Sequence, residues 1–204
     1  MKKILLILAL AALPSALFAQ GYVAFANTST THIRTNTTSL PGGAVGSMDG
    51  AGQWRIALYI APSGETLESA FTLAVADIGN APSTTTNTFG ALGRGRFNGG
   101  NPFAIDGNGG TAIAFQVRAW SASFATYELA KEAWDLGTPG VLVGRSTIGS
   151  VTPGIGGSPT PSLFGVGAGQ IGGFDMVPAP VPEPSSIALG LLGVGAIALF
   201  RRRK

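Results

Sequence analysis

This chain of 204 residues is 45% hydrophobic but only 11% charged, and it contains no cysteine. Disulfide bonds, thiol catalysis and cysteine-ligated metals are therefore excluded. The net charge of +3 comes from the ends, where six of the 13 basic residues lie, whereas residues 20–180 hold seven basic and nine acidic side chains. Because this middle region is slightly acidic, we expect no nucleic acid among the partners.

The first 19 residues have the three parts of a secretory signal peptide. Two lysines precede an apolar run over residues 4–13, and Pro14 ends that run before a group of small residues. We expect signal peptidase to cut after Ala19, so that Gln20 becomes the new N-terminus. An apolar run of about ten residues is too short for a retained membrane anchor, which needs about 20. The sequence thus predicts export.

Residues 20–177 are expected to form one Gly- and Thr-rich domain of short strands. Apolar side chains occupy every second position of 53–60 and of 111–120, which is typical of β-strands with two different faces. In the second of these segments Gln116 and Arg118 fall on the face opposite to the large apolar side chains. Further strands are expected within 22–26, 141–148 and 170–177.

One helix is expected inside this domain, between residues 121 and 140. Ser121 or Ser123 can cap its start, Gly137 can take the left-handed position after its end, and Pro139 prevents its continuation. The apolar stripe at helical spacing comprises Phe124, Tyr127, Ala130 and Trp134. The ambiguous segment 65–78 is interpreted as a helical turn followed by a strand. Together these elements predict an all-β fold, an antiparallel β-sandwich or jelly-roll-like domain with one helical insertion.

Reactive side chains are scarce in this domain. His32 is the single histidine and lies in a Thr-rich segment, so a two-histidine metal site is impossible. The carboxylates are spread through expected loops and the helix, with no context that brings two of them together. Asp106 and Asn108 match a fragment of a calcium loop, but a tight hairpin turn explains them equally well. We expect no catalytic residue, no metal and no cofactor.

The three tryptophans offer a second interpretation of the domain. Trp54 and Trp134 lie in line with apolar neighbours and are expected in the core. Trp120, at the end of an expected strand, is the least constrained and is the candidate for stacking against a sugar ring. A carbohydrate-binding module is therefore the alternative to a purely structural or interaction protein, and a glycoside-acting enzyme is a weaker third hypothesis.

The last 27 residues, 178–204, form a separate segment with three parts in a fixed order. A charge-free run from Ile187 to Phe200 is expected to enter the inner membrane as a helix of about 21 Å, short for a hydrocarbon core of about 30 Å. Since the chain is exported, its basic end remains in the cytoplasm. The residues before the run are Pro182, Glu183, Pro184 and Ser185, and those after it are Arg201, Arg202, Arg203 and Lys204.

This order of parts resembles the PEP-CTERM sorting signal of exported proteins in Gram-negative bacteria. The resemblance implies that an exosortase, a membrane enzyme, reads the tripeptide and processes the chain near it. It also implies a precursor tethered transiently or permanently in the inner membrane. The product would then reside at the cell surface, in the outer envelope or in the extracellular matrix, with exopolysaccharide and biofilm components as potential partners. A plain tail anchor remains the alternative.

Overall fold

The computed structural model describes residues 20–47, 52–74, 85–86, 95–105 and 107–180. Two long strands, β4 (Trp54–Pro62) and β8 (Ile113–Ser121), form its centre. They pair antiparallel over their whole length, from Trp54 opposite Ser121 to Pro62 opposite Ile113. Both strands coincide with the segments 53–60 and 111–120, in which apolar side chains occupy every second position. This pattern favours a strand because successive side chains point to opposite faces of a sheet.

Shorter strands extend this pair into a nine-stranded sheet. Its main path runs β3-β2-β11-β9-β8-β4-β5, while β10 pairs with β8 and β6 pairs with β4. The pairing of β2 with β11 is parallel, and the other strand pairs of this sheet are antiparallel. The additional strands are β2 (Arg34–Asn36), β3 (Val45–Ser47), β5 (Thr72–Leu73), β6 (Thr85–Thr86), β9 (Leu142–Arg145), β10 (Gly149–Val151) and β11 (Asp175–Pro178).

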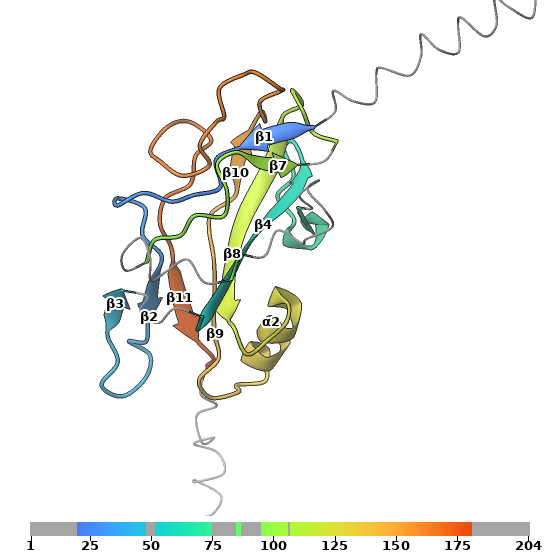
Figure 1. Cartoon of the computed structure of the whole chain (residues 1–204). Coiled ribbons are helices and arrows are strands. Elements are labelled where there is room, and N and C mark those ends of the chain that lie inside the picture. Colours follow the sequence, from blue (N-terminus) through green and yellow to red (C-terminus); the bar gives the residue numbers. More distant parts are fainter. Residues whose placement is uncertain (1–19, 48–51, 75–84, 87–94, 106, 181–204) are drawn as a thin grey trace, which may run out of the picture.

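One face of the sheet is covered by a small second sheet and by irregular loops. Strands β1 (Gly21–Val23) and β7 (Phe103–Ile105) pair antiparallel and lie across one end of the long strands (Figure 1). Phe25 contacts Phe97 and Phe103 edge to face, with ring centroids 5.0 and 5.5 Å apart. These rings pack with Ile56, Leu58 and Phe115 of the large sheet in a continuous core. Burial of such aromatic and aliphatic surface is the main force that closes this face.

A buried asparagine fixes the glycine-rich part of these loops. The Nδ2 group of Asn27 donates to the carbonyl oxygens of Thr31 and Gly95, at 3.0 and 2.8 Å, and its Oδ1 atom accepts from the amide of Phe97 at 2.8 Å. One side chain thus satisfies three backbone groups that no strand pairs. This explains how a layer without long strands can still be buried.

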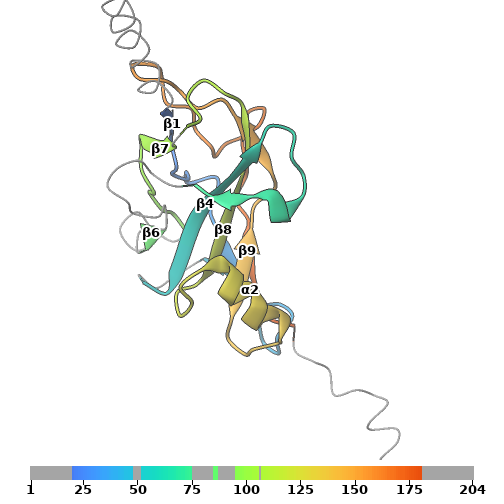
Figure 2. The same cartoon turned by 90° about the vertical axis from the view of Figure 1, so that its right-hand side faces the viewer.

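The opposite face carries the helix α2 (Tyr127–Asp135), which Figure 2 shows in front of β8 and β9. Tyr127 and Ala130 are buried against the sheet, as the apolar stripe predicted. The predicted cap at Ser121 or Ser123 is wrong. Thr126 is the cap and accepts from the amide of Leu129, because Ser121 belongs to β8 and its hydroxyl accepts from the amide of Leu142 at 2.9 Å.

Other local predictions about this face are confirmed. Gly137 follows the helix with a φ of 72°, and segment 65–78 begins with a 3₁₀ turn, Glu68–Ala70, that leads into β5. The all-β class is confirmed, with one short helix. The expected sandwich differs from the structure, because one large mixed sheet is covered by a two-stranded sheet and loops on one side and by α2 on the other. The glycine-rich loops lack the long alternating runs that a second full sheet requires.

The described body begins and ends at opposite ends of the long strands (Figures 1 and 2). β1 lies at one end, and β11 runs to the other, where the amide of Ala179 donates to the carbonyl of Val141 at 3.0 Å. The described fold therefore extends to Ala179. Within the part of the chain that the structure describes, no helix combines the length and the apolar character needed to cross a membrane.

We predict that Gly149→Ala lowers the free energy of unfolding by about 1–3 kcal/mol. A Cβ atom at Gly149 would lie 2.4 Å from the Phe115 ring and 2.7 Å from the carbonyl oxygen of Gly169, so the strand or the ring must shift. The matched control is Gly172→Ala, whose added methyl group meets no atom within 4 Å. Urea unfolding of the full-length chain in detergent, followed by tryptophan fluorescence, measures both variants. Equal stability of the two variants would contradict this account of the packing.

Candidate functional site

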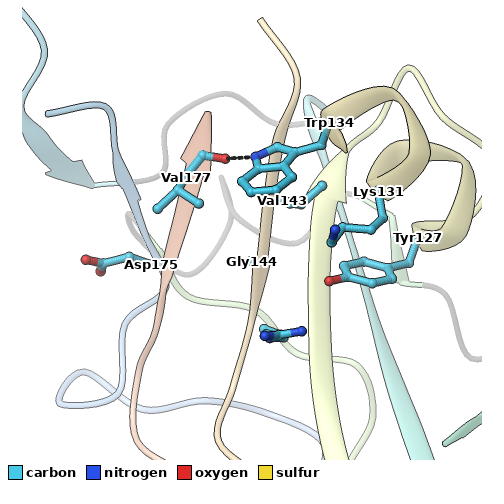
Figure 3. Close-up of a pocket in the computed structure, with 8 residues that line it drawn as sticks. Tyr127, Lys131, Trp134, Val143, Gly144, Asp175 and Val177 are labelled. Atoms are coloured by element: carbon cyan, nitrogen blue, oxygen red, sulfur yellow. Dashed lines mark hydrogen bonds between the residues drawn. The ribbon is translucent and has the colours of Figure 1, made fainter. Parts of the chain in front are cut away.

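A groove of about 330 Å³ lies between α2, β9 and β11 (Figure 3). Trp134, from the last turn of the helix, lines it together with Val143 of β9 and Val177 of β11. The indole N–H of Trp134 donates to the carbonyl oxygen of Val177 at 3.1 Å. This bond spans from helix to strand and fixes the orientation of the ring. Its single polar group is therefore used, and the Lys131 ammonium lies 4.8 Å from the centroid of the indole ring, over one of its faces.

Three charged side chains also line the groove, and each has an ion partner. Lys131 comes from the helix, Arg145 from the end of β9 and Asp175 from the start of β11. Such partly exposed pairs add little to stability, but they leave no unbalanced charge among these three side chains. The pairs are Lys131–Asp135 at 2.5 Å, Arg34–Asp175 at 3.1 Å, and Arg145–Glu68.

A buried arginine lies beneath the helix, next to the groove. Arg118 of β8 is only 7% exposed, although the sequence places it on the face of the strand opposite to the large apolar side chains. Its guanidinium carbon lies 4.1 Å from the centroid of the Tyr59 ring and 5.0 Å from that of Tyr127. A guanidinium group is weakly hydrated and binds aromatic faces, so burial between two tyrosines costs it less than burial in an aliphatic core.

Hydrogen bonds engage two of the N–H groups of Arg118. Its Nε–H donates to Oε1 of Gln116 at 2.9 Å, and a terminal N–H donates to the carbonyl oxygen of Glu68 at 2.9 Å. The carboxylate of Glu128 lies 3.7 Å away on the helix. Arg118 therefore joins three elements, namely the sheet, the 3₁₀ turn and α2, and it holds in place the helix that forms one wall of the groove.

The two tyrosines around Arg118 are held in their neutral form. Burial, and then the neighbouring Glu128 carboxylate, raise the pKa of Tyr59, whose hydroxyl donates to Oε1 of Glu128 at 3.0 Å. Burial also raises the pKa of Tyr127, partly offset by the nearby Arg118 charge. Desolvation penalises a phenolate more than a phenol, so Tyr127 acts as a packing group and Tyr59 as a packing and hydrogen-bonding group, and neither acts as a base.

The structure places Trp120 differently from the sequence analysis, and the assignment of sugar stacking to this residue is corrected. Its side chain is 0% exposed, its indole N–H donates to the carbonyl of Phe124 at 3.1 Å, and its ring meets Tyr127 edge to face. The helix covers the strand end that the sequence left open, so no sugar ring can reach this indole. Trp54 and Trp134, which the sequence analysis expected in the core, are each partly buried against a core cluster, and Trp134 also lines the groove.

The other predicted site residues divide between described and undescribed regions. The sorting residues 182–185, the membrane segment with ends Ile187 and Phe200, the basic tail 201–204, Ala19 and Asp106 lie outside the described residues. Gln20 opens the described body, and its Oε1 atom accepts from the hydroxyl of Tyr22 at 2.6 Å. His32 is partly buried in its loop. Among the described residues, no three histidine, aspartate or glutamate side chains gather where they could share a metal ion.

The sequence analysis did not identify the groove as a unit. Lys131, Arg145 and Asp175 are far apart in the chain and meet only because β9 pairs with β11 while α2 packs on β9. One signal was available. Arg118 and Gln116 interrupt the apolar character of their strand, which indicates a covering element that supplies partners for a buried charge.

Comparison with known proteins identifies the C-terminal segment. A sequence model of the PEP-CTERM protein-sorting motif matches residues 180–204. No curated protein and no solved structure matches the chain. The chain therefore ends in a PEP-CTERM motif, as the resemblance predicted, and this motif implies an exported protein with a membrane-anchored sorting signal that an exosortase processes.

We predict that the fold loses stability above pH 10 because the pKa values of Tyr59 and Tyr127 are raised in the folded state. Below about pH 10, the usual tyrosine pKa, both states keep the phenol protons and stability is fully retained. As the pH rises further, the unfolded chain ionises first and the folded state is progressively disfavoured. The variant Tyr59→Phe/Tyr127→Phe should show a shallower fall in the free energy of unfolding between pH 9 and 11, measured in urea at each pH. Identical slopes for the two proteins would contradict the burial of these hydroxyl groups.

Proposed function

We propose that this chain is an exported protein of the cell surface, outer envelope or extracellular matrix that acts structurally or by binding, without catalysis. The match of residues 180–204 to the sorting motif is the observation that supports this proposal most directly. In this proposal signal peptidase removes residues 1–19. The segment from Ile187 to Phe200 then tethers the precursor in the inner membrane, and an exosortase-type enzyme cuts near Pro184.

The position of the motif relative to the fold supports this role. The matched segment begins directly after Ala179, which follows the end of β11 and whose amide donates to the carbonyl of Val141. The described body is thus closed before the motif starts. An enzyme could read and remove the segment without taking a strand from the sheet.

The side chains of the body favour binding or structure over catalysis. The chain has one histidine and no cysteine, so a cysteine nucleophile is excluded and His32 is the single imidazole that could act as a base. Two carboxylates approach the helix-covered face, but each already has partners in the protein. Glu68 pairs with Arg145, and Glu128 accepts from Tyr59 and lies beside Arg118. A glycoside-acting enzyme, the third hypothesis, needs two carboxylates free to face a substrate in one cleft.

Carbohydrate binding is the second candidate function. Trp120 can no longer support it, since this residue is buried. The groove at Trp134 favours it instead, because it combines an oriented indole with polar groups at its walls. Such binding would fit a surface or matrix protein that meets exopolysaccharide.

We predict that deletion of residues 182–204 abolishes most of the surface-retained protein and shifts it to the soluble fraction. Glu183→Gln should slow processing, so that precursor accumulates in the membrane fraction, because the charge between the two prolines is lost. The matched control is Glu132→Gln, the same change at an exposed position of α2. Fractionation with immunodetection measures each variant. Unchanged fractionation of the deletion variant would contradict the sorting role.

The mature C-terminus provides an independent test. Mass spectrometry of the wild-type protein should find a terminus near Pro184. An intact Lys204 on the surface-located protein would show that the segment is a permanent anchor and would overturn the processing step.

A further inference from the structure

We propose that the groove between α2, β9 and β11 binds a neutral polysaccharide, with Trp134 as the stacking residue. This inference deepens the proposed surface role, because it names the partner and the site. The inference rests on the proposed function only because a surface location brings the protein into contact with polysaccharide. Binding by the purified chain can be measured without testing that location.

The apolar part of the groove fits the face of a sugar ring. The C–H groups on one face of a pyranose carry slight positive charge and pack against the π face of an aromatic ring. The indole N–H of Trp134 is bonded to the Val177 carbonyl, so the rest of the ring is carbon, and a stacked sugar would take the face over which the Lys131 ammonium lies, 4.8 Å from the ring centroid. Val177, 39% exposed, extends this surface along β11 (Figure 3), whereas Val143 is only 5% exposed and contributes little to it.

The charges of the groove favour a neutral ligand over an anionic one. Lys131, Arg145 and Asp175 could all exchange hydrogen bonds with hydroxyl groups, as donors from the first two and as an acceptor from the third. Each is already paired, with Asp135, Glu68 and Arg34 respectively, so the three lining charges are balanced. A phosphate or a uronate would have to displace these carboxylate partners. A hydroxyl group can bond beside them.

The groove is also formed before any ligand binds. Its volume of about 330 Å³ lies at the lower end of the range of small-ligand sites, enough for one or two sugar units of a longer chain. Its wall is fixed by the bond from Trp134 to Val177 and by the contacts of Arg118 beneath the helix. A preformed site spends little of its binding free energy on ordering.

Affinity electrophoresis of the full-length chain in detergent tests the proposal. The probes are two neutral polymers, a β-1,3-glucan and a galactomannan, and two anionic ones, alginate and polyphosphate. We expect retention by at least one neutral polymer, whereas any retention by the anionic ones comes from the basic ends of the chain and does not change in groove variants. Trp134→Ala should weaken that retention at least about fivefold, as expected for loss of a central aromatic anchor. Trp134→Phe should weaken it less. The matched control Trp54→Phe alters a tryptophan packed against the core of the other face and should leave retention unchanged.

A second variant separates binding from folding. Val177→Asp places a charge on the apolar surface of the groove but keeps the carbonyl that orients Trp134, and it should also reduce retention. The proposal is overturned if no neutral polymer retains the wild-type chain, or if Trp134→Ala weakens retention by the anionic polymers instead. It is also overturned if Val177→Asp retains normal binding, or if Trp54→Phe weakens binding as much as Trp134→Ala. Any of these results would leave the sorting experiment untouched.

Discussion

Arg118 carries a full positive charge inside the face of the sheet that α2 covers, and the arrangement of that face follows from the need to accommodate it. Two tyrosine rings enclose the guanidinium group, and Gln116 and the Glu68 carbonyl accept its hydrogen bonds. An isolated charge could not be buried there, since its desolvation would cost several kcal/mol, on the order of a large part of the stability of a domain. Helix, turn and strand must therefore be in place together.

The groove depends on the same constraint. Tyr127 belongs both to the cage around Arg118 and to the wall of the groove. Trp134 follows two turns later on the same helix, so a change that loosens Arg118 also displaces the indole. The candidate binding surface is thus built on rigid elements, in contrast to the glycine-rich loops of the other face. The ion pairs at its rim balance the charges of the groove but add little to the free energy of unfolding.

Local patterns predicted much of this structure. The alternation of 53–60 and 111–120 identified β4 and β8, the apolar stripe identified α2, and the order of residues in the tail identified the sorting motif. The predictions that were wrong concerned residues whose contacts come from distant parts of the chain. The hydroxyl of Ser121 accepts a hydrogen bond from the amide of Leu142 and does not cap the helix. Trp120 is covered by a helix that begins seven residues later. The groove requires the pairing of β9 with β11, which no single segment encodes.

The position of β11 determines how the body can respond to a pull. This strand is bonded on both sides, to β2 and to β9, and it ends at the pole opposite to β1 (Figure 1). Tension applied through the residues after Ala179 would act along the strand, so the bonds to both neighbours would be loaded in shear at the same time. They would have to break together, whereas a strand peeled sideways from an edge loses its bonds one by one. For a precursor tethered through its C-terminal segment, loading in shear is the mechanically stronger of these two geometries.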